Sequence, residues 1–153
     1  MAGINTPLKI APVTLTGRFV RLEPLSREHI DAMGKWAYDR ELWKWTAMLP
    51  LDRASLEAWI NEGLDGQRNG TGLPFATVLL ATNDVVGSTR FLNISARDGR
   101  MEICATVVAP AYQRSVVNTE AKLLMLTHAF ETLGATRVEL KTHKNNEKSR
   151  RAI

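Results

Sequence analysis

One polar segment separates an apolar, strand-like run from a long amphipathic stretch, and its residues could bind a phosphorylated ligand. The segment runs from Pro110 to Ala121. Backbone N–H groups at the start of a helix, together with the helix dipole, favour anions such as a pyrophosphate. Arg114 could add a charge-assisted hydrogen bond to the same anion. The segment also fits an ordinary connection between a strand and a capped helix, so its residues alone leave both interpretations open.

Two other kinds of reactive side chain point less clearly to chemistry. The single cysteine, Cys104, lies in an apolar run, where a cysteine usually serves as a small core residue. No histidine stands near it in a nucleophile motif, so we do not expect it to be catalytic. His29, His128 and His143 lack the spacing of metal ligands, and we expect no metal site.

The formal net charge of +4 at pH 7 favours an anionic partner only weakly, because much of it is concentrated near the C-terminus. A solvated basic surface explains this cluster as well as a phosphorylated cofactor or a nucleic acid does. The cluster contains no interleaved aromatic residues, which ranks nucleic-acid binding last. Its members are Lys141, His143, Lys144, Lys148, Arg150 and Arg151.

The length and composition predict one globular domain. A chain of 153 residues with 44% hydrophobic and 24% charged residues can form a hydrophobic core of its own. We expect residues 1–12 to form a flexible tail and residues 13–153 a single domain. No apolar run approaches the roughly 20 residues of a membrane span. The lone cysteine fits a reducing, cytoplasmic compartment.

The hydrophobic pattern alternates between strand and helix periods along the chain. Ser26 and Asp52 are expected as helix N-caps and Gly134 as a helix stop. Strands are predicted at 13–25, 75–81, 85–93, 101–108 and 136–142. Helices are predicted from Ser26 to Ala37, from Asp52 to Leu64, from Asn118 or Thr119 to Leu133, and at 147–153.

This order of elements predicts an α+β fold with a mixed α/β sheet. Three strands follow one another, with turn residues at 82–84 between the first two, which indicates an antiparallel meander. The strand–helix–strand unit that comes next requires a crossover connection. The strands at 101–108 and 136–142 should therefore lie side by side and parallel.

With these elements in place, the polar segment resembles the cofactor loop of the GNAT superfamily of acetyl-CoA-dependent N-acetyltransferases. The family pattern is Gln/Arg-x-x-Gly-x-Gly/Ala, and the chain has Gln113-Arg114-Ser115-Val116-Val117-Asn118, followed by Thr119-Glu120-Ala121. A second piece, Asn146 to Ser149, is similar to the family's Asn-x-x-Ser at the start of the last helix. The resemblance covers roughly residue 13 to the end. Within the superfamily the chain is similar to the Rim type, which acetylates ribosomal-protein N-termini.

The resemblance implies where acetyl-CoA would bind. In the family, the strand before the loop bulges and its backbone binds the pantetheine arm. The loop and the helix start bind the pyrophosphate, and the asparagine contacts the cofactor arm. The matching positions are Thr106, Val107, Val108, Gln113, Arg114, Ser115, Val116, Val117, Asn118, Thr119, Asn146 and Ser149.

The resemblance also implies the catalytic groups. Family members usually let the amine attack the thioester directly, without an acyl-enzyme. Glu102 would be the general base, directly or through a water, although a solvent-facing strand carboxylate fits its position equally well. A backbone N–H near Val107 would polarise the thioester carbonyl. Trp45 lies in the loop that borders the family's acceptor groove, but a core or lid role is the preferred interpretation of Trp43 and Trp45.

The chain departs from the family pattern in two places. Val116 replaces the expected glycine and Asn118 replaces glycine or alanine. A β-branched residue resists positive φ and holds a ligand away from the backbone. The family also continues past this chain's end through two more strands, and that part often carries a tyrosine that protonates the leaving thiolate. Neither Tyr38 nor Tyr112 matches it, so we expect a C-terminally truncated GNAT-like fold that lacks its last strands.

These observations predict an acetyl-CoA-dependent N-acetyltransferase that acts on a primary amine, such as a protein N-terminus or a small amine. The alternatives are a catalytically impaired GNAT scaffold that serves as a binding module and, less favoured, a nucleic-acid-binding module. Without the last strands, the strand at 136–142 would form an open sheet edge with unpaired amides. We therefore expect a homodimer that covers this edge.

Overall fold

A six-stranded sheet forms the centre of the computed structural model, which describes residues 6–153. The strand order is β1-β2-β3-β4-β5-β6, and all neighbours are antiparallel except β5 and β6, which are parallel. This arrangement confirms the predicted mixed sheet, its meander and its parallel last pair. The strands are β1 (Leu15–Thr16), β2 (Val20–Pro24), β3 (Leu73–Leu79), β4 (Val85–Ser95), β5 (Arg100–Val108) and β6 (Arg137–Leu140).

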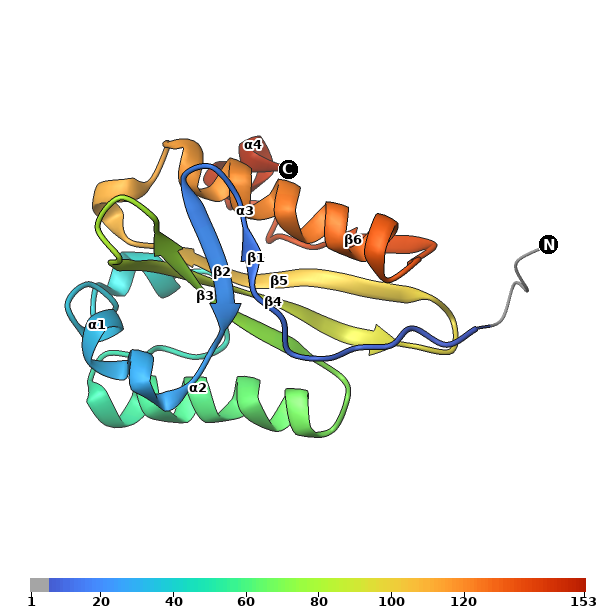
Figure 1. Ribbon diagram of the computed structural model, residues 1–153. Helices are drawn as coiled ribbons and strands as arrows, with labels where there is room; N and C mark the ends of the chain where they lie inside the picture. Colours follow the sequence, from blue (N-terminus) through green and yellow to red (C-terminus); the bar gives the residue numbers. More distant parts are fainter. Residues whose placement is uncertain (1–5) are drawn as a thin grey trace.

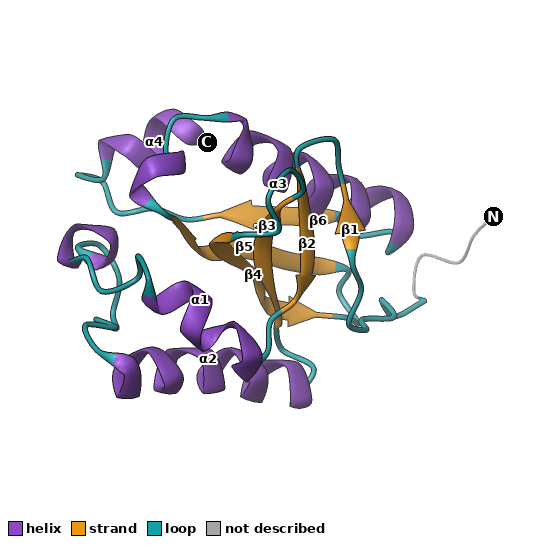
Figure 2. Cartoon of the chain, turned by 60° about the vertical axis from the view of Figure 1, so that its left-hand side comes forward, coloured by secondary structure: helices purple, strands orange, loops and turns teal. Residues whose placement is uncertain are grey.

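Helices cover both faces of the sheet, as Figure 1 and Figure 2 show. α1 (Ile30–Gly34) and α2 (Arg53–Arg68) lie on one face, and α3 (Val116–Thr127) lies on the other. α3 continues into a π-helical turn at His128–Thr132, and α4 (Glu147–Ala152) follows β6. Short 3-10 segments lie at Arg27–His29, Arg40–Trp43 and Pro110–Tyr112.

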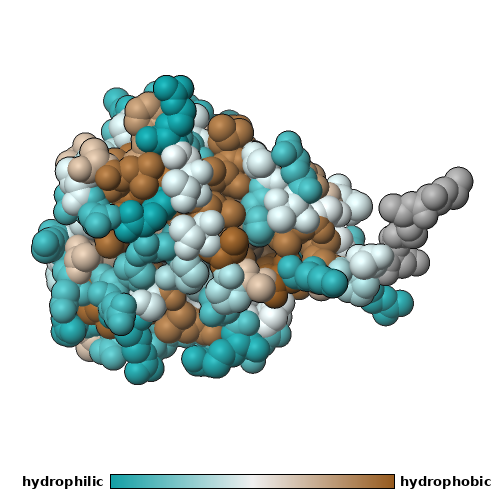
Figure 3. Space-filling view, viewed as in Figure 1, coloured by the Kyte–Doolittle hydropathy of each residue, from teal (hydrophilic) through white to brown (hydrophobic). Residues whose placement is uncertain are grey.

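Each face of the sheet buries its own hydrophobic cluster. Phe75, Phe91 and Met125 are fully buried on the α3 face. Trp43 and Trp59 lie on the α2 face, where their rings meet edge to face with centroids 5.2 Å apart. On the side of the molecule seen in Figure 3, hydrophobic residues reach the surface in separate patches among hydrophilic ones. The strands and helices thus form a two-sided core, in which the sheet lies between its helices.

Local sequence signals set several boundaries as predicted. Ser26 and Asp52 each accept a hydrogen bond from a backbone N–H of the helical turn that follows them. Asn83 takes a φ of 65° in the turn between β3 and β4, a left-handed conformation that asparagine tolerates. Gly134 takes a φ of 75° after the helical segment and ends it.

Several predicted boundaries differ from those in the structure, and two of these differences bear on the candidate site. The strand expected at 13–25 is a hairpin, because β1 and β2 pair with each other in antiparallel register. The long helix begins at Val116 rather than after Asn118 or Thr119, because Ser115 is its N-cap. The earlier start moves the first turn of α3 into the middle of the polar segment.

The hairpin is anchored to α3 by Glu120, which the sequence did not single out. Its carboxylate accepts hydrogen bonds from the backbone N–H groups of Arg18, Phe19 and Val20 at 2.6, 2.8 and 2.7 Å. Gly17 lies against the same carboxylate, since a Cβ there would be 2.4 Å from the Glu120 Cδ. The contact joins two parts of the chain that lie 100 residues apart in the sequence, at the start of α3.

The part of the expected N-terminal tail that the structure describes, residues 6–12, contains no helix or strand. Leu8 is nevertheless buried in the cluster under α3. Its N–H donates to the Ala96 carbonyl at 3.0 Å, just after β4. Residues 1–5 of that expectation lie outside the described residues.

Candidate functional site

β5 and β6 separate after a short paired stretch and leave a wedge between them. Their pairing ends at Ile103 and Leu140, whereas β5 continues to Val108. On its other side β5 remains paired with β4 as far as its last residue. The outer edge of residues 104–108 therefore has no neighbouring strand among the described residues, and its backbone groups can pair with an extended ligand.

A β-bulge in β5 marks the point where the strands separate. The step from Ser88 to Arg90 on β4 faces the longer step from Val107 back to Cys104 on β5. Ala105, inside the longer step, takes a left-handed φ of 50°. An extra residue with one left-handed position bends a strand and increases its twist. A bulge at this place was implied by the family resemblance, and the register confirms it.

The polar segment is shorter than expected, and its left-handed residue is not Val116. Ser115 Oγ accepts from the Val117 N–H at 3.3 Å and donates to the Tyr112 carbonyl at 2.6 Å. Arg114 has a φ of 57°, which costs a residue other than glycine on the order of 1 kcal/mol. Val116 is the first residue of α3, and its φ is not positive. A valine resists only a positive φ, so Val116 is not strained here, and its side chain is 48% exposed at the helix start.

The other predicted residues of the segment point in different directions. The Val117 side chain is buried in the core, and Gln113 Nε2 donates to the Val108 carbonyl at 3.2 Å. Thr119 is exposed. The Asn118 Oδ1 is buried without a hydrogen-bond partner among residues 6–153. What this end of the wedge offers an anion is therefore mainly the N–H groups of the first helical turn.

Lys122, which was not singled out from the sequence, lies against the bulge from α3. Its Nζ donates to Thr106 Oγ1 at 2.7 Å, and Thr106 Oγ1 shares a hydrogen bond of 2.8 Å with Thr89 Oγ1. Burial lowers the pKa of Lys122 to about 8. Lys122 forms no ion pair with any carboxylate of the described chain. The sequence shows Lys122 only as a lysine next to the apolar stripe of a helix, a common arrangement that does not predict a role at the site.

The carboxylate of Glu102 is buried, contrary to the solvent-facing alternative. Its side chain is 4% exposed, and its Oε2 lies 3.1 Å from Lys141 Nζ. The same oxygen accepts from Asn93 Nδ2 at 3.0 Å. Burial alone would raise the pKa of Glu102, but the hydrogen bonds and the charge of Lys141 outweigh it and hold the pKa below its usual value. Glu102 is therefore ionised at neutral pH, one residue before the last β5–β6 pair.

Cys104 follows on the same strand and is not prepared as a nucleophile. Its thiol is partly buried, and burial raises the pKa of the thiol. A raised pKa disfavours the thiolate, which is the reactive form. The geometry thus agrees with a packing role for this cysteine.

The second piece of the family pattern forms the start of α4. Asn146 is the N-cap, and its Oδ1 accepts from the Ser149 N–H at 3.2 Å. The Asn-x-x-Ser spacing therefore has a local physical reason, because asparagine is a favoured N-cap. α4 follows β6, so Asn146 and Ser149 lie on the β6 side of the wedge, whereas the α3 start follows β5.

Trp43 and Trp45, both in the segment between α1 and α2, have different surroundings. Trp43 is buried, and its Nε1 donates to the Ala37 carbonyl at 2.6 Å. Trp45 is 40% exposed and stacks on His143, with ring centroids 4.7 Å apart. His143 follows β6, so this stack joins the loop before α2 to the loop beside Lys141.

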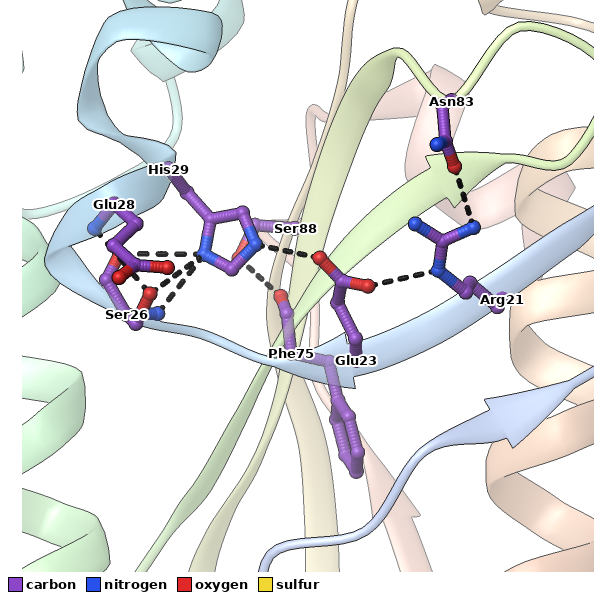
Figure 4. Close-up of polar contacts among 8 residues, drawn as sticks. All are labelled: Arg21, Glu23, Ser26, Glu28, His29, Phe75, Asn83 and Ser88. Carbon is purple, nitrogen blue, oxygen red and sulfur yellow. Dashed lines mark hydrogen bonds and ion pairs between the residues drawn. The ribbon is translucent and has the colours of Figure 1, made fainter.

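A Ser–His–Glu cluster before α1 looks like a hydrolytic triad but acts as a helix cap (Figure 4). His29 Nε2 lies 2.8 Å from Glu23 Oε1, and the Ser26 N–H donates to His29 Nδ1 at 3.0 Å. Ser26 Oγ accepts from the Glu28 N–H at 3.3 Å. Because Nδ1 already accepts a backbone N–H, it is not available to take a proton from the hydroxyl.

No group of three or more His, Cys, Asp or Glu side chains within residues 6–153 could hold a metal ion. In the same range, no helix is both long enough and apolar enough to span a bilayer. The titratable side chains that the structure brings together at the wedge are Glu102, Cys104, Lys122 and Lys141.

Comparison with a family model assigns most of the chain. The model described as an acetyltransferase (GNAT) domain matches residues 20–153, which include the wedge, the polar segment and α4. No curated protein sequence matches the chain.

Solved structures share the fold over nearly the whole chain. A GCN5-related N-acetyltransferase from Brucella melitensis is 28% identical with a TM-score of 0.87, and the match covers 99% of this chain and 70% of that one. A structure from T. thermophilus is 31% identical with a TM-score of 0.83, covering 95% of this chain and 74% of that one. RimJ from Mycobacterium smegmatis, in complex with CoA-disulfide, is 22% identical with a TM-score of 0.75 and coverages of 92% and 73%, a likeness in fold alone. The chain belongs to the GNAT acetyltransferase family.

Proposed function

We propose that this chain transfers the acetyl group of acetyl-CoA to a primary amine by direct attack of the amine. The observation that carries the proposal is the wedge, in which the bulged free edge of β5 leads to the N-terminus of α3. An extended arm with amide groups can pair with a free strand edge, and a pyrophosphate suits a helix N-terminus. In CoA, a pantetheine arm with amide groups is joined to a pyrophosphate, which is the order in which the strand edge and the helix N-terminus follow each other here.

The residues at the wedge fit such a ligand. The backbone of Thr106, Val107 and Val108 lies on the free edge of β5, where it would bind the arm and polarise the thioester carbonyl. Arg114 is exposed beside the first turn of α3 and would pair with the pyrophosphate. The Asn146 Oδ1 is used by the cap of α4, which leaves its NH2 group for the arm. Acetyl-CoA would supply the thioester that the amine attacks.

Glu102 is the group we propose as the proton acceptor. Its lowered pKa keeps it ionised, so it can hold an incoming ammonium group by charge and hydrogen bond. It accepts a proton once the attack has made the nitrogen acidic. Glu102→Gln should lower kcat and leave the affinity for acetyl-CoA nearly unchanged, because Glu102 is not among the groups that would hold the cofactor.

The decisive experiment is a titration with acetyl-CoA by calorimetry and thermal melting. A ligand that binds only the folded state raises the melting temperature by mass action. Val116→Gly should bind more tightly, since the exposed valine side chain narrows the approach to the helix N-terminus. Leu123→Gly is the matched control, because Leu123 is an exposed residue of the same helix. A folded sample whose melting temperature does not change at millimolar acetyl-CoA would sink the proposal.

The finer assignments are also proposals. We propose the Rim-like type with a protein N-terminus as acceptor, contacted by the exposed Trp45. The single cysteine supports a cytoplasmic location. β6 is an outer strand of the sheet, and we propose that a second copy covers it. A monomer in sedimentation at high concentration would refute the dimer, and CoA binding without transfer to any amine in a broad panel would indicate the binding-module alternative.

A further inference from the structure

Lys141 places a primary amine where the proposed base needs one. Its Nζ lies 3.1 Å from Glu102 Oε2. A general base must lie within roughly 2.6–3.2 Å of the group that it deprotonates. Lys141 directly follows Leu140, the last residue of β6 that pairs with β5, so the amine lies at the closed end of the wedge.

Glu102 and Lys141, the two partners of this ion pair, differ in how tightly their side chains are packed. Glu102 is 4% exposed, and Asn93 holds the same oxygen that faces Lys141. The Lys141 side chain is 67% exposed, so little of its stem is packed against the rest of the protein. The second lysine of the wedge, Lys122, instead donates to Thr106 from the α3 side. Of the two lysines that the structure brings to the wedge, only Lys141 has its amine at a carboxylate.

We propose that Lys141 is itself an acetyl acceptor, a modification site within the chain whose amine lies where Glu102 would deprotonate an acceptor amine. The inference rests on the proposed acetyl transfer. The Lys141 ammonium group, whose pKa is raised by the hydrogen bond and charge of Glu102, first loses one proton to solvent. The neutral nitrogen then attacks the thioester carbonyl carbon, the C–N bond forms and the C–S bond breaks. Glu102 takes the proton from the nitrogen, and the leaving thiolate takes one from solvent. The product is an acetyl-lysine without charge, which can no longer form an ion pair with Glu102.

The test is site-resolved mass spectrometry of the full chain incubated with acetyl-CoA. Lys35 is an exposed lysine beside α1 and reports the background of chemical acetylation. Lys141 should be acetylated at least about tenfold faster than Lys35, since a positioned base accelerates transfer by at least that factor. The rate per molecule should not depend on protein concentration. In Glu102→Gln it should fall to the Lys35 level.

A second variant keeps the test decisive if Glu102→Gln does not fold. Lys141→Arg retains a cation for Glu102 but removes the amine, so the added mass of one acetyl group should disappear. Acetylation of Lys141 no faster than that of Lys35, or unchanged in Glu102→Gln, would overturn the inference. A parallel assay with small amines separates the two proposals: transfer to them with unmodified Lys141 refutes only this inference. Absence of both transfer and acetyl-CoA binding refutes the proposed function as well.

Discussion

Glu120→Gln should destabilise the fold by about 2 kcal/mol, because it removes an acceptor that three backbone groups share. Glu120 Oε1 accepts from the Arg18 N–H, and Oε2 accepts from the Phe19 and Val20 N–H groups. Glutamine can place its carbonyl oxygen at only one of these two positions. At least one backbone N–H then faces an NH2 donor. A hydrogen bond to a charged group contributes about 1.5–3 kcal/mol, and the partial exposure of this site favours the lower half of that range.

The effect should depend on pH. Burial opposes the charge on Glu120, but its hydrogen bonds to three backbone N–H groups outweigh burial and lower the pKa of the carboxyl group. A carboxyl group with a lowered pKa stabilises the folded state fully above its ordinary pKa. That stabilisation is lost as the pH falls through the lower, folded-state pKa. The difference between the native chain and Glu120→Gln should therefore be complete at neutral pH and shrink in acid.

Urea unfolding followed by tryptophan fluorescence, at neutral pH and at several acidic values, measures both quantities. Glu131→Gln is the control, because Glu131 is an exposed glutamate in the helical segment that continues α3. It should change the free energy of unfolding by less than about 0.5 kcal/mol. A comparably small effect of Glu120→Gln, or a difference that stays constant into acid, would refute the idea that this carboxylate anchors the hairpin.

Three further changes test the wedge. Gly87→Ala should cost about 1–3 kcal/mol in urea unfolding, because a Cβ there would lie 2.6 Å from the Val107 carbonyl oxygen at the bulge; an unchanged midpoint would contradict this close approach. Arg114→Gly should raise the free energy of unfolding by about 1 kcal/mol and weaken acetyl-CoA binding in calorimetry, since it relieves the left-handed φ of 57° but removes a cation. Lys122→Met should melt no lower than the native chain at pH 7. The difference in melting temperature between the variant and the native chain should shrink as the pH rises. The pKa of Lys122 falls from 10.5 in the unfolded chain to about 8 in the folded one, so the native chain gains stability between these two pH values. A native chain that melts higher than Lys122→Met at pH 7 would contradict the prediction.

The sequence predicts the sheet better than it predicts the start of α3. The strand periods and the required crossover place β5 and β6 side by side without any knowledge of the site. The helix start had three capable N-caps within five residues, namely Ser115, Asn118 and Thr119. In the structure the helix begins early enough to include Val117, which packs with Val20 in a small buried cluster. Local capping preference cannot report such a contact.

The charged contacts of the site were even harder to predict from the sequence. The ion pair of Glu102 and Lys141 depends on the register of β5 against β6, which a parallel crossover leaves open. The same register decides that Glu102 is buried, whereas alternation along one strand is compatible with either face. Lys122 reaches Thr106 from α3, and Thr106 directly follows the left-handed Ala105 of the bulge, which the strand pattern does not reveal. These contacts depend on tertiary structure, so the sequence pattern could identify candidate residues but not the residues that they contact.

The positions of backbone strain change how Val116, at the glycine position of the family's loop pattern, is expected to affect acetyl-CoA binding. Among residues 6–153, the residues other than glycine with positive φ are Asn83, Asn93, Ala105 and Arg114. Asparagine tolerates that conformation, so Ala105 and Arg114 are the two that store energy, and both border the wedge. The family pattern has a glycine at the position of Val116, but Val116 is helical and its φ is not positive. The remaining objection to activity at this position is therefore the bulk of one side chain, and Val116→Gly isolates that bulk without relieving any strain.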